Sequence, residues 1–479
     1  MVYRGTPSRD CLPCRRRKLR CDLQKESCGQ CRRANLTCTG YRDPHQLVIR
    51  DETQAIRQKA LAQASHQECL SAANTSIATL QLSWDVRARH VFFCFYVFGL
   101  SRSYDMLSSL YEREPPDGHL SMSVDAVSLA FLSHQHDAPD LSALAGKRYL
   151  AAIQLLGQAL GTPAQATSDA TLQAVLLLDL YEKIVNRNPK SSSSWMSHVN
   201  GAMSLVAIRG KHRTIASHVA RRLAMRLVIT LIISCGAAGI RVPAALSALR
   251  EDLSRYVDEK DPKWAVTGEV VGLLNLNADV RDGKITDGAE ILARLRQLDE
   301  RFITLERELP PSWHGRRVLV ADSEPLVFEG HYDMHRDHFV TQVRNVIHTT
   351  RLAINVAILA HAGDNVALKG EASAVIDGIA REICSSAPQF VLPAARPQNK
   401  VPLTPLQALQ CYTLISPVYH AGQVSSDPRM RPWVVSFLEH IAEVGGVRVA
   451  REVADVMRYR PETSHWHVYA MLGSYAFAA

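Results

Sequence analysis

Residues 11–38 read CLPCRRRKLRCDLQKESCGQCRRANLTC and hold six of the eleven cysteines in this 479-residue chain. The cysteines follow the spacing C-x2-C-x6-C-x6-C-x2-C-x6-C, and a shift of 17 residues superimposes the first three on the last three. The match extends beyond cysteine, because Cys14-Arg15-Arg16 aligns with Cys31-Arg32-Arg33. The repeat predicts two equivalent halves that pack with pseudo-twofold symmetry, each a C-x2-C turn followed by about two helical turns.

The six clustered cysteines indicate a metal site. The first ten residues are largely polar and no apolar segment of a secretory signal follows them, so we expect an intracellular protein whose thiols stay reduced. One tetrahedral zinc would leave two thiolates unused, whereas two zincs need eight ligand positions, so two of the six sulfurs must bridge. The pseudo-symmetry makes the bridging pair equivalent residues of the two halves. We therefore predict two zinc ions per chain, with the ligands Cys11, Cys14, Cys21, Cys28, Cys31 and Cys38.

Positive charge is concentrated in the same part of the chain. The first 50 residues carry 12 Lys and Arg against four Asp and Glu, while the other 429 residues hold 43 of each sign. The whole net charge of +8 therefore belongs to the first tenth of the sequence. Such an asymmetry is expected of a segment that binds a polyanion.

The two halves of the cysteine segment differ in their basic residues. At three positions the first half has a basic residue and the second half an uncharged one. The equivalent pairs are Arg17 and Ala34, Lys18 and Asn35, and Arg20 and Thr37. A short helix whose exposed end carries Lys or Arg can enter the major groove of DNA and donate hydrogen bonds to guanine. We expect the first half to meet DNA and the second half to support it.

This segment closely resembles the fungal binuclear zinc cluster of transcription regulators, and residues 14–22 are its most typical stretch. The resemblance implies that Cys11 and Cys28 bridge the two zincs. It implies that the remaining ligands form two pairs, Cys14 with Cys21 and Cys31 with Cys38. The loop 22–27 departs from the family because it lacks the proline usually found there.

The resemblance also implies how the cluster contacts double-stranded DNA. It places the main base contact at Lys18, with Arg17 beside it, on CGG-type half-sites. The other arginines are better suited to phosphates, which contribute affinity and register but little sequence discrimination: Arg15, Arg16, Arg20, Arg32 and Arg33.

The composition divides the chain into a zinc cluster at 8–42, a linker at 43–83 and a helical domain at 84–479. The linker is rich in Ala, Gln and Ser and has one candidate helix at about 51–70. Large apolar residues do not form a heptad there, so a coiled coil is not supported. A monomer on one half-site and a homodimer joined through the helical domain both agree with the sequence.

Residues 84–479 show apolar residues at helical spacing almost throughout, as in the buried stripe Leu172, Leu176, Leu180 and Ile184. No convincing set of alternating strands is present, so the fold class is mostly α. The domain resembles the helical regulatory domain of fungal regulators, with its best local match at Trp195-x2-His198-x2-Gly201-Ala202-x2-Leu205-x3-Arg209-Gly210. The longest uncharged apolar stretch, 227–240, is too short to span a bilayer, so no membrane partner is expected. The aromatic run 92–98 and the five scattered cysteines are expected to be buried in the core.

Two other functions are alternatives to DNA binding. His331, His335 and His338 fall at i, i+4 and i+7, which on one helix could bind a metal and support an enzyme, although no further ligand accompanies them. A packed helix of the regulatory domain is the simpler interpretation. Phosphate loops, nucleophile elbows and kinase signatures are also absent from the sequence, so no catalytic residues are predicted. A zinc-dependent protein-interaction module on a helical scaffold is the second alternative.

The sequence therefore predicts a nuclear, sequence-specific DNA-binding regulator of RNA polymerase II genes in a fungus, specific for one pathway such as a biosynthetic gene cluster. Its cofactor is zinc, two ions per chain. Its expected partners are double-stranded DNA and transcription coregulators, with a homodimer open. Residues 15–20 also suit a nuclear import signal, although DNA contacts alone would explain them.

Overall fold

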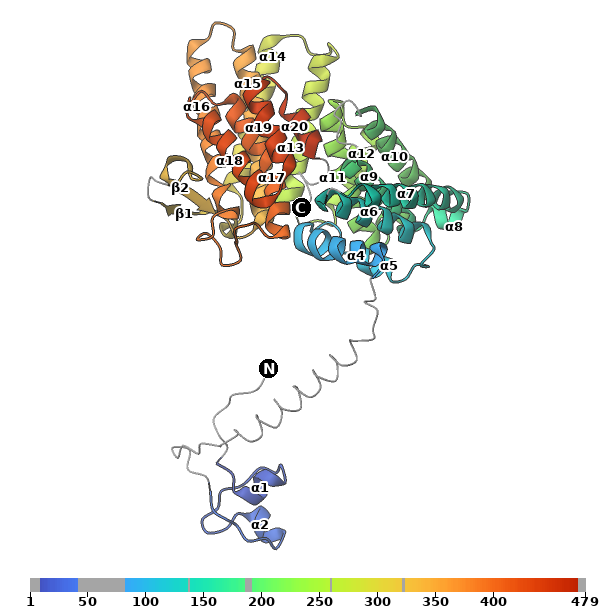
Figure 1. The fold of residues 1–479 in the computed structure, drawn as a ribbon, viewed down its shortest axis with the longest axis vertical. Coiled ribbons are helices and arrows are strands. Elements are labelled where there is room, and N and C mark those ends of the chain that lie inside the picture. The colour runs from blue at the N-terminus through green and yellow to red at the C-terminus, as the bar shows by residue number, and fades with distance from the viewer. Residues whose placement is uncertain are drawn as a thin grey trace. The chain divides into compact units, whose positions relative to one another are not determined.

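The computed structural model describes residues 9–41, 82–136, 138–185, 192–258, 261–320 and 324–472. The chain divides into two compact units, Met1–Gln81 and Leu82–Ala479 (Figure 1). The expected linker at 43–83, with its candidate helix at 51–70, lies outside the described residues except for its last two positions. The boundaries of the three expected segments stay a prediction.

Two short helices form the described part of the first unit, α1 (Leu12–Arg16) and α2 (Gly29–Arg33). Each has five residues, so the expectation of about two turns was too long. Both helices end in the same way, because Lys18 and Asn35 adopt left-handed φ angles of 53° and 51°. The next amide then turns back to a cysteine carbonyl, Leu19 to Cys14 and Leu36 to Cys31, both at 3.0 Å. The 17-residue repeat of the sequence is therefore also a repeat of the backbone.

The second unit is helical through most of its described residues, as predicted. Its first part contains α4 (Trp84–Val91), the π-helix η1 (Phe92–Leu100), α5 (Leu107–Tyr111), α6 (His119–His136), α7 (Pro139–Leu160), α8 (Pro163–Ala166) and α9 (Asp169–Val185). Its middle contains α10 (Ser192–Ile215), α11 (His218–Ala238), α12 (Ala244–Ser254), α13 (Pro262–Arg281) and α14 (Gly288–Arg307). Its last part contains α15 (His338–His361), α16 (Val366–Ser385), α17 (Pro405–Val424), α18 (Met430–Gly445), α19 (Arg448–Tyr459) and α20 (His465–Leu472). The 3-10 helices among the described residues are η3 (Pro311–Trp313), η4 (Phe328–Gly330) and η5 (Pro388–Phe390).

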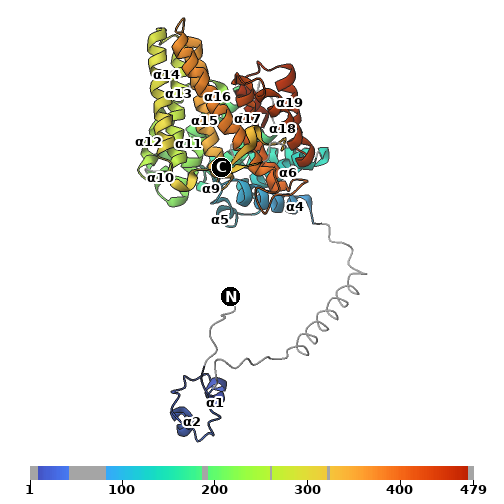
Figure 2. The same ribbon diagram turned by 90° about the vertical axis from the view of Figure 1, so that its left-hand side faces the viewer.

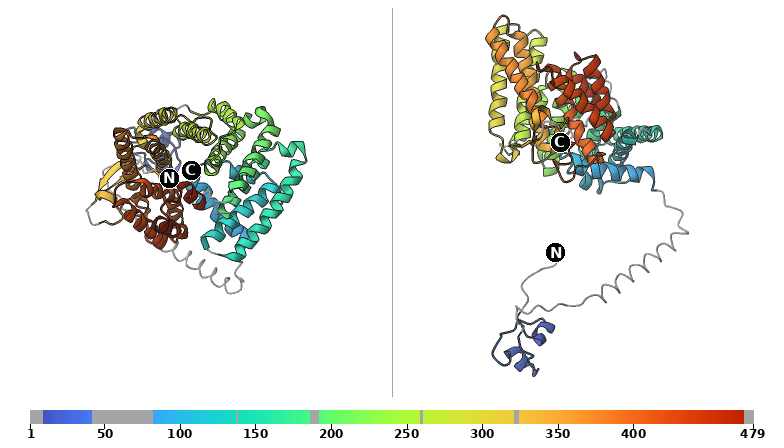
Figure 3. Two further views of the ribbon diagram at one scale, coloured as in Figure 1. Left: turned by 90° about the horizontal axis from the view of Figure 1, so that it is seen from above. Right: turned by 60° about the vertical axis from the view of Figure 1, so that its left-hand side comes forward.

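The apolar stripes of the sequence lie in the core. All four residues of the α9 stripe are buried, and α9 packs beside α6 and α7 (Figure 3). The long helices α13, α14, α15 and α16 pack each against the next in chain order, and Figure 2 shows the four of them close together. In the aromatic run, Phe92 stacks on Tyr96 with ring centroids 5.2 Å apart, and both rings meet Phe131. Phe93 and Phe95 are only partly buried against the same core, and Phe98 is 67% exposed, so the expectation of burial was wrong for Phe98. No helix among the described residues has the length and hydropathy to cross a membrane.

A small antiparallel hairpin interrupts the helices. Strand β1 (Arg316–Leu319) pairs with β2 (His331–Met334), and Arg317 lies opposite Asp333. The two side chains form a bidentate ion pair at 3.0 and 2.9 Å, and the Ser385 hydroxyl of α16 donates to the same carboxylate at 2.9 Å. The sequence did not predict this hairpin, whose strands are four residues long and need these partners to be held in place.

The regulatory-domain motif of the sequence falls on α10, although the side chains of 191–199 lie outside the description. The Arg209 guanidinium is buried and donates to the carbonyls of Thr167 and Ser168 and to the Asp169 carboxylate, at 2.9, 2.5 and 2.6 Å. Gly210 follows with φ of 67°, a backbone angle that interrupts the helix and that glycine adopts most easily. The Arg-Gly pair therefore fixes α10 onto the start of α9.

The scattered thiols are buried with one exception. Cys235, Cys384 and Cys411 are fully buried, as expected. Cys94 is exposed beside His90, so the expectation of burial was wrong there, and Cys69 lies outside the described residues.

A buried ion pair inside α9 offers a test of the helical core. The Lys183 ammonium lies 2.7 Å from the Asp179 carboxylate and 3.1 Å from the Ser234 hydroxyl of α11. In a Lys183→Met chain the carboxylate would stay buried without its cation, and we expect the free energy of unfolding to fall by about 3–5 kcal/mol. Urea unfolding followed by circular dichroism measures the change. Lys284→Met removes an exposed partner of Asp279 and should cost under about 1 kcal/mol; equal effects would contradict the prediction.

Candidate metal centre and nucleic-acid interface

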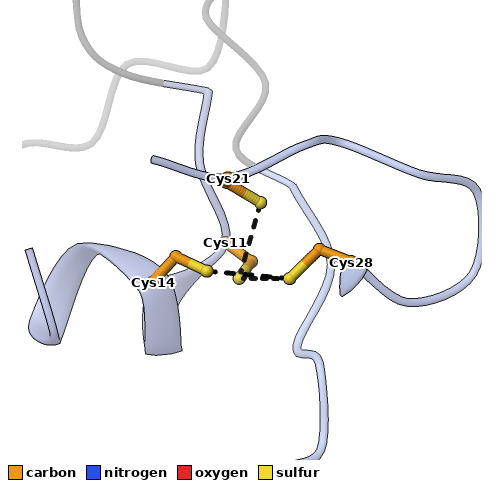
Figure 4. A group of neighbouring side chains, drawn as sticks. All are labelled: Cys11, Cys14, Cys21 and Cys28. Atoms are coloured by element: carbon orange, nitrogen blue, oxygen red, sulfur yellow. Dashed lines mark hydrogen bonds between the residues drawn. The ribbon is translucent and has the colours of Figure 1, made fainter. Parts of the chain in front are cut away.

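The six cysteines of the first unit come together from the two helices and from the segment that follows each helix. Cys11 and Cys28 are the N-caps of α1 and α2, Cys14 and Cys31 lie within these helices, and Cys21 and Cys38 come from the segments that follow. Their sulfurs form two groups of four, in each of which all sulfurs lie within 4.8 Å of one another. Figure 4 shows the first group, Cys11, Cys14, Cys21 and Cys28. The second group is Cys11, Cys28, Cys31 and Cys38, so Cys11 and Cys28 belong to both.

The distances between the sulfurs fit zinc. Cys28 Sγ lies 3.7 Å from Cys11 Sγ and 3.6 Å from Cys14 Sγ, and Cys11 Sγ lies 3.6 Å from Cys31 Sγ. Four sulfurs at 2.3 Å from a tetrahedral zinc are separated by about 3.8 Å, whereas a disulfide needs about 2.05 Å. All six donors are soft thiol groups, five of them buried, which suits Zn2+. The cluster therefore has the composition and spacing of a two-zinc site.

Protons must leave the cluster when metal enters it. Burial raises the pKa of the Cys31 thiol to about 12 when no metal is bound. Because zinc binds the thiolate, loading the site releases protons and couples folding of this segment to metal and to pH. The Cys31 amide donates to Cys28 Sγ at 3.3 Å, a contact that stabilises negative charge on this sulfur.

Asp22 and Gly29 connect the two halves of the cluster, a contact that the sequence analysis missed. Both oxygens of the Asp22 carboxylate accept from the Gly29 amide, at 3.0 Å each, at the start of α2. A Cβ at position 29 would lie 2.6 Å from Asp22 Oδ2, so only glycine admits this approach. The loop without the family proline is closed by the same contact, and by the Tyr41 hydroxyl, which donates to the Gln24 carbonyl.

We expect Gly29→Ala to weaken the cluster, because the added methyl group displaces the Asp22 carboxylate. Zinc should be lost to a chelator at a lower concentration than in the wild-type chain, which a competition titration with a zinc-sensitive dye measures. Gly40→Ala serves as the control for position 29, because a Cβ there meets nothing within 4 Å. Its φ of 79° makes it strained in its own right, so an effect of Gly29→Ala no larger than that of Gly40→Ala would contradict the proposed contact.

The basic side chains expected to meet DNA are all exposed. In the first half none has a hydrogen bond or ion pair with any described residue: Arg15, Arg16, Arg17, Lys18 and Arg20. In the second half Arg32 donates to the Gln24 side chain, and Arg33 Nε donates to the Gly29 carbonyl at 3.3 Å. The two halves therefore differ in the availability of their cations as well as in their number.

Lys18 occupies a backbone position that its residue type does not favour. Asn35, its equivalent in the second half, tolerates a left-handed φ well, whereas lysine gains nothing there from its side chain. Its side chain leaves the chain immediately after the last turn of α1, beside Arg17 at the C-cap. The position combines a strained backbone with an exposed cation that contacts no carboxylate in the described part of the chain, and strained backbone is common at functional sites.

The three histidines considered as a metal site do not lie on one helix, so that interpretation was wrong. His331 is in β2, His335 is buried in the following turn, and His338 begins α15. Asp337 starts α15, because its carboxylate accepts from the Val340 amide at 2.9 Å. Burial lowers the pKa of His335 to about 4, and His338 Nε2 lies 2.8 Å from the Leu100 carbonyl, so both residues serve packing.

One further group of titratable side chains joins α14, α15 and α16. The buried His348 Nε2 lies 2.9 Å from Glu306 and 3.1 Å from Glu382. Arg344 and Arg351 also contact Glu306, at 3.0 and 3.4 Å, so cations already compensate the carboxylates. Burial alone would raise the pKa of Glu306. The hydrogen bond from His348 and the positive charge of His348 outweigh this effect and lower that pKa to about 2. The group is an internal ion-pair network, and its residues lie too far apart in the sequence to have been predicted together.

Comparison with known families agrees with this geometry. A family model of the fungal Zn(2)-Cys(6) binuclear cluster domain matches residues 9–47, and one of the fungal specific transcription factor domain matches residues 102–346, just over half of the chain. No curated protein and no solved structure matches the chain. Both families consist of transcription factors and not of enzymes, and the first binds two zinc ions through six cysteines. The chain therefore belongs to the fungal transcription factors with a binuclear zinc cluster and is a DNA-binding transcription regulator.

Proposed function

We propose that this regulator acts in the nucleus, where its cluster reads CGG-type sites in double-stranded DNA and controls RNA polymerase II genes of one pathway, such as a biosynthetic gene cluster. The observation that carries the proposal is the row of five exposed cations on the first half of the cluster, none of which has a partner among the described residues. On this account the DNA-binding domain is 8–42, and 84–479 is a regulatory domain that contacts coregulators or a second copy of the chain.

The proposed ligand set gives each zinc four sulfurs. Cys11 and Cys28 bridge, Cys14 and Cys21 complete the first zinc, and Cys31 and Cys38 complete the second. This assignment is supported by the two groups of four sulfurs, which share Cys11 and Cys28. Six thiolates and two Zn2+ leave two negative charges, which the surrounding arginines offset.

The proposed contacts divide the cations by role. Lys18 and Arg17 donate to guanine in the major groove, and Arg15, Arg16 and Arg20 hold phosphates. Arg32 and Arg33 are also proposed to hold phosphates, although each must first leave its partner within the cluster. The number of phosphate contacts is therefore three or five, depending on these two residues.

Salt dependence of DNA binding tests the proposal and counts the contacts. Binding to a CGG-containing duplex, measured by fluorescence anisotropy, should weaken steeply between about 50 and 200 mM salt. Five phosphate contacts predict a loss of about 500-fold over this range, and three predict about 40-fold. The double variant Arg32→Gln, Arg33→Gln distinguishes the two counts. Equal and salt-independent binding to cognate and scrambled duplexes would favour a protein-interaction module instead.

A further inference from the structure

Five helices of the second unit form a ring around a partly open cavity. In the order α11, α13, α15, α17 and α20, each packs against the next and the last packs against the first. The cavity that all five helices line has a volume of about 140 Å³. Gly236 of α11 allows the ring to close, because a Cβ there would lie 2.7 Å from the Trp466 ring of α20.

The wall of this cavity is mainly apolar, with a few polar side chains such as Asn277 and Ser416. Aliphatic side chains from three of the helices line it, among them Ile232, Val270, Leu274 and Val346. Its threonines do not need a polar ligand, because their hydroxyls donate to carbonyls of their own helices: Thr267 to Lys263, Thr349 to Asn345, Thr350 to Val346 and Thr413 to Gln410. An apolar cavity of about 150 Å³ accommodates a benzene ring, so the size of this one suits an apolar body of about six to eight carbons.

A second chamber of about 420 Å³ adjoins the first and is cationic. Ile229 and Lys263 line both chambers, so the two meet at these side chains. The basic residues of the second chamber are Arg102, Arg221, Arg222, Arg226 and Lys263. Among the described residues two carboxylates line it, Asp258 and Asp261, and that of Asp261 accepts from the Trp264 amide at 2.8 Å.

The positive charge of this chamber is only partly compensated. Arg222 pairs with Asp105 at 2.9 Å and Arg102 pairs with Asp337 at 2.7 Å. Within the described part of the chain, neither Arg221 nor Arg226 has a carboxylate within 4 Å. The Arg226 guanidinium lies over the Tyr104 ring, and its Nε is buried and has no hydrogen-bond partner there, so no carboxylate neutralises its charge.

Lys263 lies where the two chambers meet, and its pKa reflects burial and the positive charges around it. Burial lowers the pKa of its ammonium to about 7. The positive charges of Arg226, Arg222 and Arg102 lower the pKa further, and the negative charge of Asp261 opposes them. A negative group placed between Lys263 and Arg226 would relieve the repulsion and keep the ammonium charged.

We propose that the two chambers bind one small amphipathic organic anion, with its apolar body inside the ring of five helices and its acid group between Arg226 and Lys263. This inference goes beyond the proposed function, because it concerns the helical unit and involves no DNA contact. It gives the regulatory domain a ligand class: a compact monocarboxylate or similar acid with a ring or a short alkyl chain.

Calorimetric titration of the full-length, zinc-loaded chain tests the proposal with three eight-carbon probes, octanoate, octan-1-ol and octylamine. We expect octanoate to bind about tenfold or more tightly than octan-1-ol, and octylamine not to bind. Arg226→Gln should remove the preference for octanoate and keep the binding of octan-1-ol. Arg294→Gln, an exposed arginine of α14, is the matched control and should change nothing. Similar affinities for the three probes, or no binding of octanoate, would overturn the proposal.

Two further variants separate the chambers. Ala353→Phe places a ring in the apolar cavity and should abolish binding of both octanoate and octan-1-ol, with circular dichroism showing that the helices persist.

Lys263→Met should flatten the pH dependence of octanoate binding. In the wild type this binding should weaken as pH rises through about 7, because Lys263 loses its proton while the arginines facing it stay charged. His218 and Asp258 also line the chamber, so a pH dependence unchanged by Lys263→Met would assign it to them and contradict the role of Lys263.

Discussion

A Cys28→Ala chain is expected to lose both zinc ions and all sequence-specific DNA binding. Cys28 Sγ belongs to both groups of four sulfurs, so its removal leaves each proposed zinc with three ligands. Because metal binding supplies the folding free energy of so short a segment, residues 11–38 should unfold with it. Affinity for a cognate duplex should fall to the nonspecific level, a loss of about a thousandfold or more. Native mass spectrometry of the same sample counts the zinc ions.

Cys38→Ala provides the comparison, because Cys38 belongs to one group only. This chain should retain one zinc, held by the first group of four sulfurs. Cys235→Ala removes a buried thiol of α11 outside the cluster and should retain two zinc ions. If Cys28→Ala and Cys38→Ala chains both kept one zinc, Cys28 would not be a bridging ligand.

Lys18→Asn is expected to keep two zinc ions and lose sequence discrimination. Asparagine occupies the equivalent position 35 with nearly the same φ, so the backbone of α1 should not change. The free-energy difference between cognate and scrambled duplexes should fall by about 1–3 kcal/mol, because the donor to guanine is gone. Competition binding with the two duplexes measures this difference.

Arg20→Gln is the control for the loss of one positive charge. It should weaken binding to cognate and scrambled duplexes by the same factor, since a phosphate contact carries no sequence information. A Lys18→Asn chain that behaved like Arg20→Gln would remove Lys18 from base reading and leave it a phosphate contact.

The cysteine segment was the most predictable part of the chain. Zinc restricts its ligands to one geometry, so the number and spacing of cysteines were enough to predict two metal ions. The helix lengths were not predicted, because the residues that end α1 and α2 are Lys18 and Asn35 and not the glycine that usually signals such an end. The contact of Asp22 with Gly29 was missed for a related reason, since a single glycine after Cys28 does not indicate which side chain packs against it.

In the helical unit, patterns within one helix were predictable and contacts between helices were not. The stripe from Leu172 to Ile184 predicted a buried helix correctly, because each member faces the same side of α9. His331, His335 and His338 also fit a helical spacing, but their segment crosses from a strand into the N-cap of α15. The residues that line the cavity within the five-helix ring are spread over positions 229–469. No pattern within one helix predicts that residues so far apart in the sequence lie together.

The most direct test of the central claim is selection from randomised duplex DNA with the full-length chain, with the zinc content measured on the same sample. We predict two zinc ions per chain and enrichment of CGG-containing sites, whose spacing then distinguishes a monomer from a dimer. Two zinc ions without any enriched sequence at low salt would contradict the claim that this cluster reads DNA.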